Sequence, residues 1–206
     1  MRIRALVPIA DGSEEIEAVC IIDTLRRADI EVTVARAGDT PGTEEQPQGK
    51  YPQEQQPQKL QVTASRGVIL QAETTMDRCR DQEFDAIVLP GGMPGAEHLR
   101  DDAVLTEMLK EQRAHGRLVA AICASPVVVL AHHGLIGDLR ATCYPGFMDR
   151  LPAASRSGER VVRMANLITS RGPGTALEFS LEIVDFLCGR ETREELAGQM
   201  LIPEQP

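Results

Sequence analysis

Short apolar runs alternate with segments whose apolar residues recur every three to four positions along the chain. The runs are typical of buried strands, whereas the recurring pattern is typical of the helices that cover them. We expect strands over residues 4–10, 30–38, 84–92, 117–122, 140–145 and 167–170. We expect a first helix that carries Ile16, Val19, Ile22 and Leu25 after a cap at Asp11 or Ser13, and further helices over residues 96–115, 125–133, 174–188 and 191–201.

The regular succession of strand and helix predicts an α/β fold with a mostly parallel sheet and helices on both faces. The length of 206 residues fits a single domain over residues 1–206. In such sheets, ligands bind beyond the carboxyl ends of the strands. Three segments qualify as candidate sites: residues 11–17, the Gly91–Gly92 turn, and Cys123.

One segment interrupts this pattern. Residues 39–59, DTPGTEEQPQGKYPQEQQPQK, are rich in Pro, Gln and Glu and contain almost no apolar side chains. Such a composition cannot bury enough surface to offset the entropy lost on ordering. The sequence therefore predicts a flexible surface insertion between two strands, with a docking role as the less favoured alternative.

Composition narrows the function classes. A net charge of −9 at pH 7 argues against a broad nucleic-acid-binding surface, and an aromatic content of 3% without Trp offers few platforms for base stacking. No apolar run reaches the ~20 residues of a membrane span. The start of the chain turns acidic with no small-residue cleavage site, so we interpret it as a first strand and not a signal peptide. We therefore expect a cytoplasmic protein without membrane partners.

The chain has five cysteines, and no C-x-x-C pair indicates a zinc site or a disulfide framework. Most are interpreted as reduced, buried packing residues. Cys123 differs, because AAICASP over residues 120–126 places it at the end of a strand among small residues, with Pro126 suited to a first helical turn. This is the steric pattern of a nucleophile elbow. A helix N-terminus there would favour a thiolate and supply N–H donors for an oxyanion; a packing role stays the alternative.

The four histidines supply no evident base for this thiol, because none lies at the carboxyl end of an expected strand. The acidic segment DGSEEIE offers carboxyl groups instead. Glu14 and Glu15 suit a first helical turn as negative charges. Glu17 lies between Ile16 and Ala18, and burial there would raise its pKa and make it a proton carrier.

Four motifs, in this order, resemble the ThiJ/PfpI superfamily and within it the branch of the DJ-one and YajL proteins: ADGSEEIEAV, VLPGGMPGAEHL, AAICASP and TSRGPGTALEF. The resemblance covers nearly the whole chain apart from residues 39–59. It implies a flavodoxin-like three-layer sandwich, a homodimer, and chemistry without a metal or an organic cofactor. It also disfavours a PfpI-type peptidase, which has histidine directly after the cysteine, where this chain has Ala124.

The same resemblance assigns roles around the thiol. It identifies Cys123 as the nucleophile and redox-sensitive thiol, and Glu17 as the carboxyl group hydrogen-bonded to it. It implies that Gly91, Gly92 and Ala124 supply backbone donors beside the sulfur.

Three further residues take part in what the resemblance implies. Arg27 and Arg66 match arginines that line a small anion-binding surface near the site, at the dimer interface of relatives. Where many relatives have histidine, this chain has Tyr144. Its hydroxyl could donate a hydrogen bond to a substrate carbonyl, but the change weakens any argument for a Cys–His pair.

The resemblance supports two hypotheses about function. In the first, the chain is a stress-response enzyme, a hydro-lyase or hydrolase of the glyoxalase III or protein deglycase type. It would convert methylglyoxal to lactate or reverse early glycation adducts, so its partners would be small dicarbonyls or glycated substrates. In the second, it is a non-enzymatic redox sensor or chaperone, switched by oxidation of Cys123 to sulfinate.

Overall fold

The computed structural model describes residues 2–38 and 60–203, so the insertion predicted at residues 39–59 lies outside the described part of the chain. The described strands are β1 (Arg4–Ile9), β2 (Glu31–Arg36), β3 (Gln61–Thr63), β4 (Ile69–Gln71), β5 (Thr74–Thr75), β6 (Ala86–Leu89), β7 (Leu118–Ile122), β8 (Val161–Met164) and β9 (Leu167–Ser170). The α-helices are α1 (Glu15–Arg27), α2 (Gly95–Asp101), α3 (Ala103–Ala114), α4 (Ala176–Cys188) and α5 (Arg190–Gln199).

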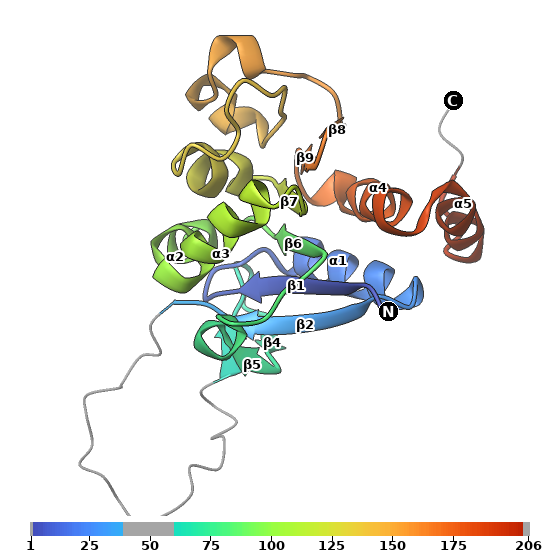
Figure 1. Ribbon diagram of the computed structural model, residues 1–206, viewed down its shortest axis with the longest axis horizontal. Coiled ribbons are helices and arrows are strands. Elements are labelled where there is room, and N and C mark those ends of the chain that lie inside the picture. The colour runs from blue at the N-terminus through green and yellow to red at the C-terminus, as the bar shows by residue number, and fades with distance from the viewer. Residues whose placement is uncertain (1, 39–59, 204–206) are drawn as a thin grey trace, which may run out of the picture.

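Within the described residues, seven strands form one sheet in the order β5-β2-β1-β6-β7-β9-β8. All neighbours pair in parallel except β8 and β9, which are antiparallel. Helices α2 and α3 cover one face, and α1 and α4 cover the other (Figure 1). This arrangement confirms the predicted flavodoxin-like α/β sandwich.

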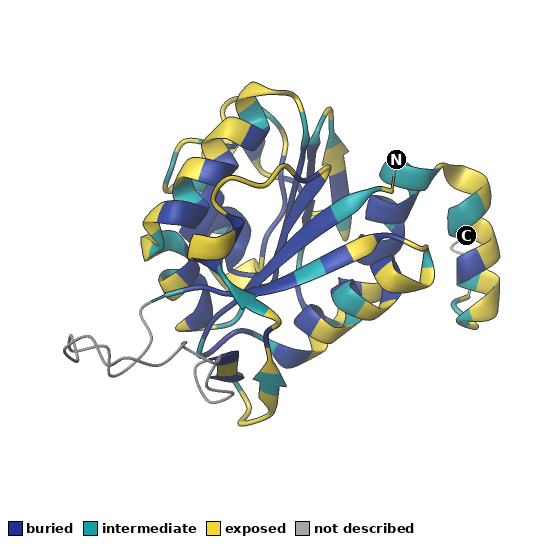
Figure 2. Cartoon of the chain, turned by 60° about the horizontal axis from the view of Figure 1, so that its bottom comes forward, coloured by how far each residue is buried: buried dark blue, intermediate teal, exposed yellow. Residues whose placement is uncertain are grey.

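The core follows from the pleat of the strands. Along β1, Val7 packs into the layer of α1 and α4, whereas its neighbour Leu6 packs into the layer of α2 and α3. Because both faces are covered, β6 and β7 are buried at every position, and the central strands are dark along most of their length in Figure 2. That double burial is why their sequences are continuous apolar runs.

The expected strand at residues 140–145 is wrong. Only an isolated bridge between Ala141 and Arg156 forms there. The amide of Thr142 donates to the side chain of Thr169 at 2.9 Å, and the amide of Tyr144 donates to the carbonyl of Cys123 at 2.8 Å. The backbone groups are thus used in loop contacts, and the antiparallel partner of β9 is β8, which the sequence pattern did not indicate.

The expected helix at residues 96–115 consists of two helices. Asp102 separates them with extended backbone and accepts a hydrogen bond from the amide of Leu105 at 2.9 Å, so it caps α3. The expected helix after Cys123 is a short π-helical segment, Pro126–Ala131. None of the described helices is long and apolar enough to cross a membrane.

The first helix begins later than the predicted cap. Glu14 is the capping residue of α1, and its carboxylate accepts from the amide of Glu17 at 2.7 Å. Ser13 instead accepts from the amide of Ala10 at 3.0 Å, and Asp11 bonds to the β3 strand. The correction places Glu17 in the first turn of α1.

Candidate active site

The site lies beyond the carboxyl ends of three adjacent strands, β1, β6 and β7. The chain runs outward from β1 to β2 on one side, whereas β6 and β7 extend the sheet on the other, so the order reverses between β1 and β6. Crevices at such reversals are where open α/β sheets bind ligands. The three candidate segments of the sequence therefore converge on one place.

Cys123 occupies a strained turn directly after β7. Its φ is 64°, in the left-handed region that residues other than glycine rarely adopt. Its amide donates to the carbonyl of Ser170 at 3.0 Å, and its carbonyl accepts from the amide of Tyr144 at 2.8 Å. Neighbouring segments thus hold the strained conformation, and the side chain stays 9% exposed. This backbone has the strained strand-to-helix geometry that the small residues predicted.

Glycines at the end of β6 permit the close approach of two loops. A Cβ at Gly91 would lie 2.6 Å from the Cβ of Cys123. Gly92 has a φ of 89°, and a Cβ there would lie 2.4 Å from the carbonyl oxygen of Gly12. No larger residue fits at either position without displacing backbone or the side chain of Cys123.

Glu17 reaches this turn from α1. It is fully buried, and its Oε2 accepts a hydrogen bond from the amide of Gly91 at 2.8 Å. Its Oε1 is buried and has no hydrogen bond of ordinary geometry among the described residues, although the side chain interacts with the Cys123 thiol. Burial raises the pKa of Glu17 to about 7, and the charge of Glu14 adds to this rise. A carboxyl group of this kind can gain and lose a proton near neutral pH.

The thiol is also held in its neutral form. Burial raises the pKa of Cys123 to about 12, and the charge of an ionised Glu17 adds to the rise. Hydrogen bonds from the amides of Gly92 and Ala124 act in the opposite direction. The thiolate expected from a helix N-terminus is therefore not the favoured form, because desolvation outweighs the hydrogen bonds from Gly92 and Ala124.

The backbone donors divide their roles. Gly92 and Ala124 donate toward the sulfur, as the resemblance implied. Gly91 was expected to do the same, but its amide serves Glu17 instead. The β6 turn therefore holds Glu17 and the sulfur of Cys123 through consecutive peptide units.

The remaining predicted residues lie at different distances from this centre. Among the described residues, Tyr144 is bonded to Cys123 only through its backbone amide, which donates to the Cys123 carbonyl, and the residue is 48% exposed. Arg66 lies beside the start of α1, where its amide donates to Glu15 at 2.8 Å. Arg27 pairs with Asp23 at 2.6 Å at the far end of α1, ten residues after Glu17 and hence about 15 Å along the helix axis. Within one chain, Arg27 is not brought to the thiol.

Sequence reasoning missed two groups that build the site. Ser125 was counted only as a small neighbour, but its hydroxyl donates to the carbonyl of Pro90 at 2.5 Å and ties the elbow to the end of β6. Arg36 was read as a strand residue, but it is buried and pairs with Asp11. A charged residue between Ala35 and Ala37, near the carboxyl end of the strand, was the only available signal for the second.

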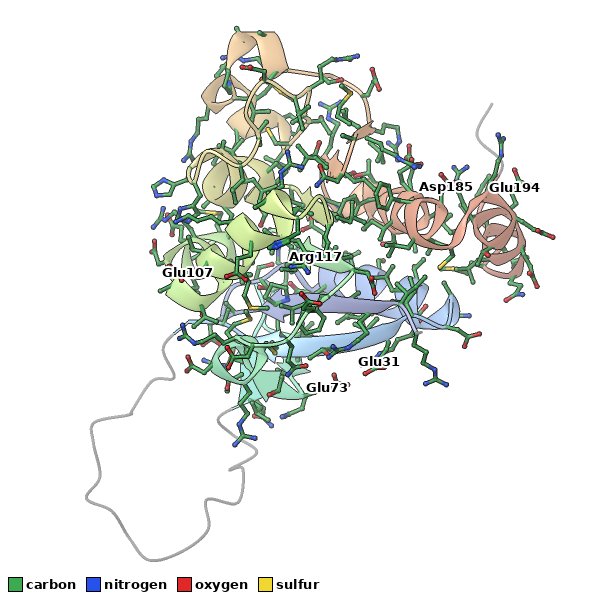
Figure 3. The ribbon with its side chains drawn as sticks, in the orientation of Figure 1. Glu31, Glu73, Glu107, Arg117, Asp185 and Glu194 are labelled. Atoms are coloured by element: carbon green, nitrogen blue, oxygen red, sulfur yellow. The ribbon has the colours of Figure 1, made fainter. Side chains whose placement is uncertain are left out.

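Other features of the surface lie apart from this centre. A groove of about 440 Å³ runs between α4 and α5, the helices that carry Asp185 and Glu194 in Figure 3, and it shares no lining residue with the Cys123 site. Within residues 2–38 and 60–203, no group of three or more His, Cys, Asp or Glu side chains gathers as metal ligands would.

Comparison with known proteins identifies the class of protein that this fold and site define. The DJ-1/PfpI family model matches residues 3–186, and the chain belongs to that family. It is 43% identical over 197 residues to protein DJ-1 homolog B of Arabidopsis thaliana, with 96% of this chain but only 41% of the plant protein covered. The chain thus spans less than half the length of that relative.

Two further comparisons cover both proteins almost completely. The glutathione-independent glyoxalase DJR-1.2 of Caenorhabditis elegans is 34% identical over 193 residues, which are 93% of this chain and 91% of that protein. The oxidized form of Toxoplasma gondii DJ-1 superposes with a TM-score of 0.87 at 44% identity, covering 98% of this chain and all of that one. The resemblance to the DJ-one branch is thereby confirmed.

Proposed function

We propose that this protein is a Cys123-dependent glyoxalase that needs no cofactor and converts methylglyoxal to lactate. The observation that carries the proposal is the placement of a strained cysteine beside a buried carboxyl group whose pKa is about 7. The glyoxalase named above, similar over nearly its whole length, supports it. All five cysteines are unpaired, which fits action in the cytoplasm.

Covalent addition is the first step. The ionised Glu17 takes the proton of the thiol as the sulfur of Cys123 attacks the aldehyde carbon. The amides of Gly92 and Ala124, which point toward the sulfur, stabilise negative charge on the aldehyde oxygen. The proton then passes to that oxygen, and the product is a hemithioacetal.

Proton transfer between the two carbons follows. Glu17 removes the hydrogen of the former aldehyde carbon as a proton and returns a proton to the former ketone carbon. The hydroxyl proton of the hemithioacetal passes to the former ketone oxygen, so the first carbon becomes a thioester carbonyl and the second carries a hydroxyl group. The first carbon is oxidised as the second is reduced, so no external electron donor is needed. The resulting thioester is cleaved by water, which releases lactate and the thiol. In this proposal the hydroxyl of Tyr144, a half-exposed residue, donates to the ketone oxygen.

The same chemistry extends to early glycation adducts. A hemithioacetal or aminocarbinol formed on a protein side chain can release its dicarbonyl, and the site then consumes it by the steps above. Direct deglycation would require the adduct itself to be bound.

Lactate formation from methylglyoxal without glutathione tests the proposal, with freshly reduced wild type compared with Cys123→Ser. We expect many turnovers per wild-type molecule and none above background in the variant, since serine is a far poorer nucleophile without a strong base. Absence of turnover by the wild type would contradict the proposal.

A second candidate function is redox sensing through oxidation of Cys123. The observation that favours it is the similarity to a DJ-1 structure described as oxidized. Backbone donors beside the sulfur would stabilise a sulfinate as well as an oxyanion. Treatment with mild peroxide followed by mass spectrometry should then give one stable two-oxygen adduct on Cys123, and an adduct spread over all five cysteines would count against a sensor.

We also propose that two copies of the chain associate through α1 and the β3–β4 hairpin. Ile16 and Val19 on α1 are 53% and 50% exposed, and Val68 and Ile69 on the hairpin are 47% and 56% exposed. Hydrogen bonds from Ser65 and Arg66 to Glu15 join the two elements into one face. An anion-binding surface that uses Arg27 near the thiol would need this second copy, because Arg27 lies far from Glu17 in its own chain.

A further inference from the structure

A buried arginine lies at the carboxyl end of β2. The side chain of Arg36 is 5% exposed, and its Nη2 donates to Oδ2 of Asp11 at 2.6 Å. Its Nη1 donates to the carbonyl of Gln61, while its Nε is buried without a partner in the described part of the chain. Since removing a guanidinium from water is costly, an ion pair like this one is a poor source of net stability. The contribution of this ion pair therefore lies in the geometry that it imposes on Asp11.

Asp11 transmits this contact to the loop after β1. Its second carboxylate oxygen, Oδ1, accepts from the amide of Thr63 at 2.7 Å. Its carbonyl contacts Nδ1 of His98 on α2 at 2.8 Å, and the next amide, of Gly12, donates to the carbonyl of Thr63 at 2.8 Å. The loop of residues 10–14 is therefore fixed from β2, β3 and α2 together.

This loop forms the back of the active site. The amide of Glu14 donates to the carbonyl of Gly91 at 2.9 Å. Gly92 lies so close that a Cβ there would be 2.4 Å from the carbonyl oxygen of Gly12 and 2.5 Å from the amide of Glu14. A shift of the loop must therefore move the turn at Gly91 and Gly92, whose amides hold Glu17 and the sulfur of Cys123.

We propose that Arg36, acting through Asp11, is a positioning residue for the Cys123 site. The pair holds the loop of residues 10–14 against the β6 turn and so fixes the backbone donors that face the carboxyl group and the thiol. Neither residue is placed in contact with the sulfur, and the effect is indirect. The inference rests on the proposed function only for its catalytic readout, because the reactivity of the thiol reports on the same donors.

The experiment compares wild type with Arg36→Met, Arg36→Lys and Asp11→Asn. Asn at position 11 has one acceptor oxygen where Asp uses two, so it must give up the contact to Thr63 or to Arg36. The first measurement is the pH profile of Cys123 alkylation by iodoacetamide, quantified on its own peptide by mass spectrometry. The second is kcat and KM for methylglyoxal. Arg163→Met is the matched control, because Arg163 pairs with Glu182 and Asp185 on α4, away from the site.

We expect Arg36→Met and Asp11→Asn to shift the alkylation profile toward higher pH and to lower kcat by about tenfold, with KM changed less than about twofold, because misplaced donors act on the reacting atoms. Arg36→Lys should restore most of both values, since it returns a cation to Asp11. The control should lower the melting temperature without moving the profile.

Unchanged alkylation and kcat in Arg36→Met, with only a lower melting temperature, would overturn the proposal. If Arg36→Met does not fold, Asp11→Asn decides it alone by the same criteria. If the wild type forms no lactate, the glyoxalase proposal fails, while the alkylation profile still confirms or overturns the role of Arg36.

Discussion

Glu17 and Cys123 are two buried ionisable groups that interact unequally. The charge of Glu17 raises the pKa of Cys123, whereas the hydrogen bond from the thiol lowers the pKa of Glu17. Burial is the largest cause of the raised pKa of both, and the charge of Glu17 also raises that of Cys123. Glu17 ionises first because its pKa, at about 7, is the lower. In the proposed reaction, ionised Glu17 is therefore a base available at neutral pH, next to a thiol that keeps its proton until a substrate arrives.

The first residue-scale prediction concerns turnover by Glu17→Gln. Gln can still accept from the amide of Gly91, but it cannot carry a proton between the two substrate carbons. We expect kcat for methylglyoxal to fall by at least about 100-fold, and wild-type kcat to rise with pH through about 7 as the base ionises. Stopped assays of lactate from pH 5.5 to 8.5 check this, and a variant with wild-type kcat would remove Glu17 from the reaction.

The second concerns stability. The pKa of Glu17 is raised from 4.5 to about 7 on folding, so the folded state holds the proton more tightly and loses stability as pH rises through about 7. The cost of ionisation is roughly 3 kcal/mol. Glu17→Gln should therefore be more stable relative to wild type at pH 8 than at pH 5 in urea unfolding. Glu107→Gln, exposed on α3, serves as the control. If Glu17→Gln and wild type differ equally in unfolding free energy at pH 5 and pH 8, the pKa of Glu17 is not raised by folding.

At the scale of elements, the sequence was sufficient to predict strands and helices whose pattern follows from a single physical rule. Double burial produced the continuous apolar runs of β6 and β7, and helical periodicity located α1 and α4. It failed where a side chain took over a backbone group. Asp102 divides α2 from α3 by capping, and Thr169 takes the amide of Thr142 that a strand would have used. Neither event alters the apolar pattern, so periodicity could not detect it.

The break at Asp102 leads to the element-scale prediction. Its carboxylate caps α3 through Leu105 and also accepts from the amide of Gly38 at 2.9 Å. Asp102→Ala should lower the free energy of unfolding by about 1–2 kcal/mol, since both amides lose their partner. Asp102→Asn keeps one acceptor oxygen and should retain about half of that free energy, because its amide nitrogen cannot accept from the second amide. Urea unfolding of the three proteins is the measurement, and an alanine variant as stable as wild type would mean that the helix break does not depend on the cap.

At the scale of the whole molecule, the site depends on strand order. Glu17, Gly91 and Cys123 are far apart in the sequence and meet because β1, β6 and β7 are neighbours. Local pattern identified each segment as the end of a strand but could not say which strands adjoin. Family resemblance implied the flavodoxin-like fold and the contact between Glu17 and Cys123, and the structure supplied the strand order. The Arg36–Asp11 contact lay beyond both sources, because it arises only when β2 is placed beside β1.

The face formed by α1 and the hairpin gives the prediction for the assembled molecule. Four half-exposed aliphatic side chains lie on these adjoining elements: Ile16, Val19, Val68 and Ile69. Clustered exposed apolar side chains often mark an interaction surface, and contact with a second copy would remove them from water. We expect wild type to sediment as a dimer and Val19→Glu to shift it toward monomer, because the interface would bury an unpaired charge. Leu201→Glu, at an 88% exposed position beyond α5, should leave the dimer intact. A Val19→Glu protein that sediments like wild type would place any self-association on another face.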